Sequence, residues 1–157
     1  IPENELTKGA ALPLDPRTKG CCVDGSRETD IPGIFACGNV LHVHDLVDFV
    51  SEEAEIAGRA AAEYILCGER EKQLVPTSAG ENVAYVLPQR AEKGRGVKLY
   101  FRVRSAFRGA VIRVEAGSVQ KTYKRIAVAP GEMENVTLKA ADLMDADNIR
   151  VSVLREG

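Results

Sequence analysis

The residues best suited to bind a ligand follow a short apolar segment. Residues 34–37 form an apolar run with the length of a buried strand, and the run ends at Gly38 and Asn39. Gly38 has no Cβ, so a ligand can approach its backbone, and the Asn39 amide oxygen can accept a hydrogen bond. Because ligands of open α/β sheets bind at the carboxyl ends of strands, we expect a binding site here. A tight turn without a ligand is the alternative, since glycine and asparagine favour turns.

The same stretch resembles the second flavin motif of the two-dinucleotide-binding-domain flavoproteins, the family of thioredoxin reductase and NADH oxidase. The motif is a threonine, a proline-glycine pair, two apolar residues, an alanine, any residue, a glycine and an aspartate. The matching residues are Thr29, Pro32, Gly33, Ile34, Phe35, Ala36 and Gly38. In the family the aspartate binds a ribityl hydroxyl of FAD. Asn39 stands in its place, and it can still accept a hydrogen bond but carries no charge.

The resemblance covers about residues 1–68 and implies the C-terminal part of an FAD-dependent pyridine nucleotide-disulphide oxidoreductase-like protein. It implies an NADH oxidase or dehydrogenase type of activity, in which NAD(P)H reduces FAD. The flavin contacts that it implies are Gly38, Asn39 and Val40, together with the amino end of the next helix at Val50 and Ser51. No catalytic residue is assigned, and the reacting groups are expected upstream.

The glycine-rich fingerprint that holds a dinucleotide pyrophosphate does not occur at the start of this segment. We therefore expect FAD to bind only in the intact protein, with the upstream FAD and NAD(P)H domains as partners, and this segment alone to bind no cofactor. Residues 1–6 resemble the family's return from the nicotinamide domain, although composition alone predicts a loop there. Because the chain starts at Ile1 and its only methionines are Met133 and Met144, we expect it to be a fragment.

The loop after the turn contains His42 and His44, followed by Asp45 and Asp48. Imidazoles and carboxylates bind several divalent metals. A second interpretation is that the histidines stabilise negative charge on reduced flavin, and a third is a loop pair without chemistry. Two histidines are few for a metal site, so we expect none.

Four cysteines, Cys21, Cys22, Cys37 and Cys67, all lie in the first half of the chain. Their spacing fits no zinc motif, and adjacent cysteines close a strained disulfide ring. We interpret Cys21 and Cys22 as strand residues and Cys37 as a packing residue, all of them reduced, as in a cytoplasmic protein.

The first half should contain a hairpin, one central strand and one helix. The hairpin is expected from residues 11–14 and 20–24, with a turn at Asp15. The helix is expected from Asp48, a candidate N-cap, to Cys67, with Gly68 as its C-terminal stop. Its apolar stripe comprises Val50, Ala54, Ala57, Ala61 and Tyr64, and the charged residues elsewhere around the axis are Glu52, Glu53, Arg59 and Glu63.

Residues 69–82 are predicted to be a linker, and residues 83–157 an all-β domain. Apolar residues alternate with polar ones in residues 83–87, 97–103, 110–115, 119–128, 133–138 and 149–154. Turns are predicted at residues 108–109, 116–118 and 130–131. About six short strands favour an antiparallel sandwich of immunoglobulin-like type or a barrel. The predicted fold class is therefore α+β: a remnant of an FAD-binding domain, then a sandwich.

The charge is unevenly distributed. Up to Ala84 there are 7 Lys and Arg against 15 Asp and Glu, and from Tyr85 onward there are 14 against 8. The basic half could bind single-stranded nucleic acid, but docking against acidic surface explains the charge better, so we expect no nucleic-acid partner. The second functional hypothesis is a non-catalytic β module that binds a partner or forms a homo-oligomer.

No apolar run is long enough to span a bilayer, and the chain does not begin with a signal-peptide pattern, so no membrane partner and a cytoplasmic location are expected.

Overall fold

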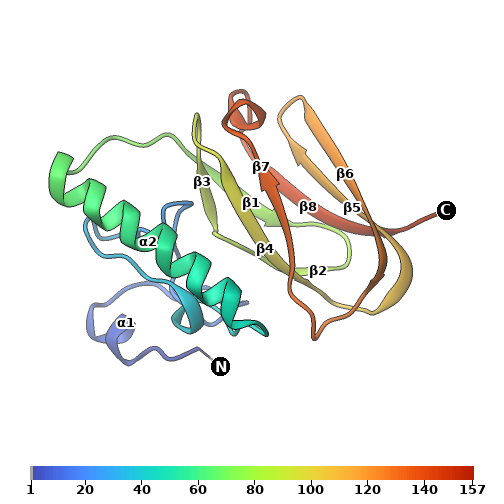
Figure 1. The fold of residues 1–157 in the computed structure, drawn as a ribbon, viewed down its shortest axis with the longest axis horizontal. Helices are drawn as coiled ribbons and strands as arrows, with labels where there is room; N and C mark the ends of the chain where they lie inside the picture. Colours follow the sequence, from blue (N-terminus) through green and yellow to red (C-terminus); the bar gives the residue numbers. More distant parts are fainter. Residues whose placement is uncertain (1) are drawn as a thin grey trace. The chain divides into compact units, whose positions relative to one another are not determined.

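The α-helices lie in the first part of the chain and the strands in the second (Figure 1). The structure is a computed structural model and describes residues 2–157; Ile1, the first residue of the predicted 1–68 segment, lies outside the described residues. The protein is mostly β with two α-helices, which is an α+β composition. Contacts divide the chain into two units, residues 1–72, called unit 1, and residues 73–157, called unit 2.

Unit 1 contains two α-helices, a 3-10 helix and long irregular segments. Helix α1 spans Glu5–Gly9, where composition predicted a loop as far as residue 6. The 3-10 helix η1 spans Gly38–Val40, and α2 spans Val47–Cys67. The predicted hairpin is reduced to a single antiparallel bridge between Leu14 and Cys21.

The turn of that hairpin has the expected chemistry. The Asp15 carboxylate accepts the backbone N–H groups of Arg17 and Thr18 at 2.7 and 3.0 Å. This is the local side-chain bonding by which aspartate favours turns. The turn prediction is therefore right, whereas the flanking strands do not extend beyond one bridge.

The prediction of a buried strand at residues 34–37 is wrong. Its one bridge pairs Phe35 with Glu28, and Ile34 is 37% exposed. A strand buried on both faces needs neighbours along both edges, and among the described residues this segment has one bridged pair, on one edge. The segment packs on α2 instead: the Phe35 ring meets Tyr64 edge-on at 6.2 Å, and a Cβ on Gly33 would lie 2.9 Å from the Tyr64 ring.

Helix α2 begins at Val47, so the prediction of Asp48 as the N-cap is wrong by two residues. Leu46 is its N-cap and supplies no side-chain hydrogen bond, while Asp48 lies in the first turn, where its charge complements the helix dipole. The predicted stop at Gly68 is confirmed, because this residue has φ +75° and its N–H binds the Tyr64 carbonyl. Only Glu53 and Ala57 are fully buried, so the predicted apolar stripe is wrong at Ala54, which is exposed.

Unit 2 has eight strands in two sheets. The strands are β1 Leu74–Ala79, β2 Val83–Leu87, β3 Arg90–Glu92, β4 Val97–Val103, β5 Phe107–Ala116, β6 Val119–Val128, β7 Glu134–Leu138 and β8 Ile149–Arg155, with the 3-10 helix η2 at Ala140–Leu143. One sheet has the order β3-β1-β8-β5-β6 and the other the order β2-β4-β7. The predicted linker at residues 69–82 thus contains β1, and β3 was not predicted.

The pairing is antiparallel except between β1 and β8, which run parallel, with Thr77 opposite Ile149. This exception corrects the expectation of an antiparallel sheet throughout. The predicted turn at residues 108–109 is also wrong, because β5 continues through it. Gly109 has φ +63°, and β5 pairs with β6 in the same register before and after it.

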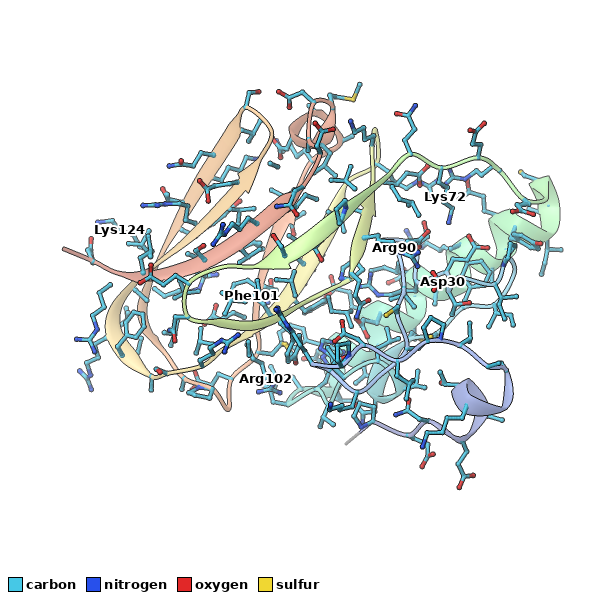
Figure 2. The ribbon with its side chains drawn as sticks, turned by 180° about the vertical axis from the view of Figure 1, so that it is seen from behind. Asp30, Lys72, Arg90, Phe101, Arg102 and Lys124 are labelled. Atoms are coloured by element: carbon cyan, nitrogen blue, oxygen red, sulfur yellow. The ribbon has the colours of Figure 1, made fainter. Side chains whose placement is uncertain are left out.

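Alternate residues of both sheets form one hydrophobic core within unit 2, as the period-two pattern predicted. Core residues include Leu99 and Phe101 of β4, Ile112 of β5, and Val151 of β8, all fully buried. Tyr100 departs from the pattern, because it is fully buried although its neighbours in sequence face the core; Lys98 Nζ lies 5.3 Å from its ring. Phe101 lies inside unit 2, and Lys124 projects from β6 (Figure 2).

Among the described residues, no helix is both long and apolar enough to cross a membrane.

Candidate functional site

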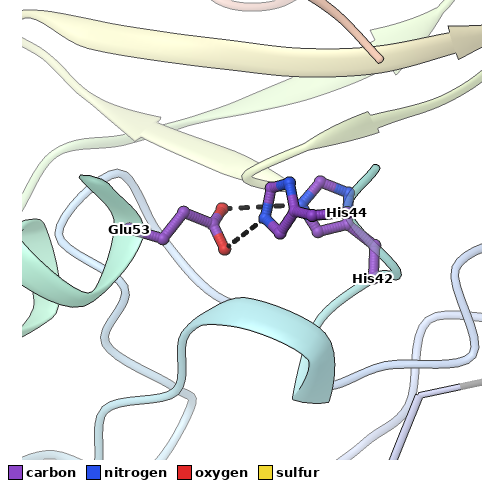
Figure 3. A group of neighbouring side chains, drawn as sticks. All are labelled: His42, His44 and Glu53. Carbon is purple, nitrogen blue, oxygen red and sulfur yellow. Dashed lines mark hydrogen bonds and ion pairs between the residues drawn. The ribbon is translucent and has the colours of Figure 1, made fainter. Parts of the chain in front are cut away.

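A buried carboxylate on α2 is the centre of the polar contacts in unit 1. Glu53 is 0% exposed, and its two oxygens face His42 and His44 (Figure 3). Each oxygen also meets a second polar group. Oε2 accepts the Gly38 N–H at 2.9 Å and lies 3.0 Å from Nε2 of His44. Oε1 lies 3.2 Å from Nη2 of Arg27 and 3.5 Å from Nε2 of His42. We call Arg27, His42, His44 and Glu53 the Glu53 cluster.

Arg27 reaches this cluster from a tight polar turn. Its φ is +67°, a left-handed conformation that is unusual for a residue with a side chain. Three bonds hold the turn: Asp24 Oδ1 accepts the N–H groups of Ser26 and Glu28, and the Arg27 N–H binds the Asp24 carbonyl. Arg27 is fully buried and ion-paired, so its surroundings hold its backbone in this strained left-handed conformation. Strain of this kind often occurs at functional sites.

Lys72 supports the same turn from outside. Its ammonium contacts Asp24 Oδ2 and Glu28 Oε2. Burial lowers the pKa of Lys72, but its bonds to the two carboxylates outweigh this and raise the pKa above its ordinary value. Because the lysine remains charged, the turn that carries Arg27 is fixed on both sides.

Gly38 is brought to the first turns of α2. It has φ +69°, and a Cβ built on it would lie 3.1 Å from Cγ1 of Val50. Its N–H is committed to Glu53. Two of the predicted site residues, Gly38 and Val50, are therefore adjacent, and the need for glycine follows from the positive φ and the close helix.

The two histidines face the carboxylate. Their side chains are buried, and their ring centroids are 4.2 Å apart. This position disfavours the interpretation in which they approach a flavin directly. The His44 backbone has a separate role, because its N–H binds Oδ1 of Asn39 at 3.2 Å.

The electrostatics follow from burial opposed by these contacts. Burial disfavours an ionised Glu53, but the bonds from His42 and His44 and the charge of Arg27 outweigh it and hold the pKa of the Glu53 carboxyl well below its ordinary range. Burial lowers the pKa of His42, which is therefore neutral at pH 7. Burial, and then the charge of Glu53, raise the pKa of the Cys37 thiol, so this cysteine is a poor nucleophile.

The cluster has the residue types of a metal site but not its charge balance. The donor atoms of His42, His44 and Glu53 lie within 4.8 Å of one another. The Arg27 guanidinium already neutralises Glu53, so a divalent ion would add two uncompensated charges to a buried site. The arrangement therefore fits a buried ion pair completed by two imidazoles better than a metal centre.

The other predicted flavin contacts lie around this buried cluster. Asn39 and Ser51 are exposed, and Val40 is half-buried in η1. A family-model scan, a search of curated proteins and a search of solved structures each found no match. The function is therefore argued from the residues and from this geometry.

Sequence reasoning missed Glu53 and Arg27. The signal for Glu53 was present: it lies three residues after Val50 and four before Ala57, within the apolar stripe. A carboxylate at such a position must be paired when the stripe is buried. The sequence carries no comparable signal for Arg27, because its role depends on a left-handed turn distant from the helix.

Proposed function

We propose that this chain is the C-terminal part of an FAD-dependent NAD(P)H oxidoreductase of the NADH oxidase or dehydrogenase type. The observation that carries the proposal is the position of Gly38 and Asn39. The motif that resembles the family's flavin motif ends against the first turns of a 21-residue helix, with Gly38 in contact and Asn39 exposed beside it. A polar residue at a helix start is where the resemblance implies the flavin.

Other motif residues hold the proline-glycine turn that precedes this segment. The Thr29 hydroxyl accepts the Ile31 N–H at 3.2 Å, and Gly33 has φ +80° in the proline-glycine turn. The Gly33 N–H binds Oε1 of Glu28 at 2.8 Å. Thr29 and Gly33 thus fix the turn from which the chain enters the segment that ends at Asn39.

The amino end of α2 could also bind hydrogen-bond acceptor atoms of a cofactor. Its N-cap, Leu46, provides no side-chain hydrogen bond to the first turn, where helix N–H groups lie beyond the reach of the intrahelical bonds. Such groups stabilise negative charge, including the charge that develops on reduced flavin. Val50 and Ser51 lie in these first turns.

FAD would accept hydride from NAD(P)H and pass on electrons. The residues of this chain would hold and orient it: Asn39 at the ribityl chain, Val40 beside it, and the amino end of α2 near the ring. The Gly38 N–H would not bind FAD, because Glu53 already accepts it.

In this proposal unit 1 is the end of an FAD-binding domain. Its large apolar side chains are unusually exposed: Val47 is 75%, Ile65 81% and Leu66 82% exposed. A helix with so little buried surface normally packs against more of a domain. The missing strands of the FAD domain are the partner that we propose for these residues. Unit 2 would be an appended immunoglobulin-like sandwich.

The test uses the longer protein that contains this chain and its upstream domains. We expect it to purify with FAD, and NADH or NADPH to bleach the flavin absorbance under anaerobic conditions. Purified longer protein that neither contains nor binds FAD would refute the proposal. Bound FAD that neither nucleotide reduces would refute the oxidoreductase assignment.

The second candidate function, a binding or oligomerisation module, is favoured by β6. This ten-residue strand is at the edge of its sheet, paired only with β5, and Ile126 on it is 89% exposed. Exposed edges can pair with another strand. Light scattering of the wild type and of Ile126→Lys tests this function: an oligomer that Ile126→Lys dissociates supports it, and a monomeric wild type contradicts oligomerisation.

A further inference from the structure

We propose that Glu53 is the positioning residue of the ligand-binding turn and holds Asn39 in place through two separate routes. The inference rests on the proposed function for its ligand, FAD, but the positioning itself can be tested without FAD. Glu53 would contact no part of the cofactor. It would act through Gly38 and His44.

The first route is the backbone of Gly38. This buried glycine has φ +69°, and its N–H donates to Oε2 of Glu53 at 2.9 Å. A buried N–H that loses its acceptor is costly, so the bond favours the one backbone conformation in which the N–H faces α2. Asn39 follows directly, and its direction from the helix depends on that conformation.

The second route is the His44 ring. Its Nε2 lies 3.0 Å from the same Oε2, and the His44 backbone N–H donates to Oδ1 of Asn39 at 3.2 Å. Because an N–H requires an acceptor, the amide oxygen of Asn39 faces His44 and its NH₂ group is directed elsewhere. Glu53 thus fixes the backbone of Gly38, just before Asn39, and it also fixes His44, whose backbone N–H binds the Asn39 side chain.

The other two members of the Glu53 cluster keep the carboxylate charged. Arg27 and His42 both approach Oε1, at 3.2 and 3.5 Å, and leave Oε2 to Gly38 and His44. Hydrogen bonds to an ionised acceptor are shorter and stronger than those to a neutral one. Glu53→Gln keeps the size of the side chain and removes this charge, which makes it the test variant.

The matched control is Glu55→Gln, on the same helix. Glu55 is 62% exposed and pairs with Arg59 one turn away. The first measurement uses this chain without FAD and follows the Gly38 amide by NMR. In Glu53→Gln we expect the Gly38 amide proton to move upfield and to exchange roughly tenfold faster or more, the factor expected from weakening one charge-assisted bond. In Glu55→Gln we expect the chemical shift and the exchange rate of the Gly38 amide proton to equal those of the wild type.

The second measurement is the dissociation constant of FAD in the longer protein. We expect Glu53→Gln to weaken binding about tenfold or more and Glu55→Gln to leave it unchanged. His44→Ala provides a variant that keeps the Arg27 pair and the Gly38 bond. It should weaken FAD binding while the Gly38 amide stays protected, because only the second route is cut.

The two measurements separate the two proposals. A Gly38 amide with wild-type shift and exchange in Glu53→Gln would overturn the positioning role, whether or not FAD binds. FAD affinity that is equal in wild type, Glu53→Gln and His44→Ala would also overturn it. A wild type that binds no FAD, together with an altered Gly38 amide in Glu53→Gln, would refute the proposed function and leave the turn-positioning part supported.

Discussion

Replacing Arg27 with glutamine removes the positive charge that neutralises the buried Glu53. Both side chains are 0% exposed, so water does not replace the lost partner. Breaking a buried ion pair by removing one member costs about 3–5 kcal/mol. Glu53 would keep its contacts with Gly38 and His44, so we expect the lower part of this range, about 3 kcal/mol, for the local stability of unit 1.

Hydrogen exchange measured by mass spectrometry suits this prediction, because it reports each segment separately. Peptides covering residues 38–57 should exchange at least about a hundredfold faster in Arg27→Gln, the factor that corresponds to about 3 kcal/mol. Peptides from β5 in unit 2 provide an internal reference. The control is Arg59→Gln, which removes an exposed ion pair on α2 and should change stability by no more than about 0.5 kcal/mol.

A double-mutant cycle with Glu53→Gln isolates the pair itself. Because the two groups are in direct contact, we expect a coupling energy of about 0.5–3 kcal/mol rather than additivity. Hydrogen-exchange rates in Arg27→Gln that equal those in Arg59→Gln would refute the claim that a buried ion pair organises unit 1. Additive effects of Arg27→Gln and Glu53→Gln on stability would refute it as well.

Three further predictions concern other parts of the account. Gly38→Ala should destabilise unit 1 by about 1–2 kcal/mol, since the residue has φ +69°; equal urea stability of the two proteins would contradict this. The pKa of His42 is lower in the folded protein than its ordinary value of 6.5, so the unfolded chain binds a proton on this histidine at higher pH than the folded protein does. The free energy of unfolding should therefore be highest above pH 6.5 and should fall as the pH decreases toward the folded pKa. Below pH 4.5 the free energy of unfolding should fall further, because the pKa of Glu53 is also lower in the folded protein than in the unfolded chain. Urea midpoints that stay constant from pH 7 downward would contradict the lowered pKa values of His42 and Glu53. Residues 73–157 should fold alone, whereas residues 83–157 should unfold at lower urea because β1 pairs with both β3 and β8; equal midpoints would contradict a structural role for β1.

The strands of unit 2 were largely predictable because their signal is local. Apolar residues alternate along β4, β5 and β8, and one face of each strand enters the core. The strand β1 was missed because Pro76 and the polar residues after it resemble a linker. It becomes a strand through pairing with β8, about seventy residues away, and a short sequence window cannot show such a contact.

The candidate site was predictable only in part. Positive φ at Gly38 follows from its type and position, and the stop of α2 at Gly68 was recognisable. The place of Glu53 in the apolar stripe was a signal, but its partners could not be predicted because the Glu53 cluster joins a turn, a loop and a helix. Residues 34–37 have the composition of a buried strand, but burial requires neighbouring strands, and those are absent from the described part of unit 1.

The central claim is that the turn at Asn39 contacts FAD, and the affinity of the longer protein for FAD tests it most directly. Fluorescence titration of wild type and Asn39→Asp gives the two dissociation constants. In Asn39→Asp one carboxylate oxygen can accept the His44 N–H, and the other can accept a ribityl hydroxyl through a charge-assisted bond. We predict that the wild type binds FAD and that Asn39→Asp binds it at least as tightly. A wild type without FAD affinity, or a clear loss of binding in Asn39→Asp, would contradict the claim.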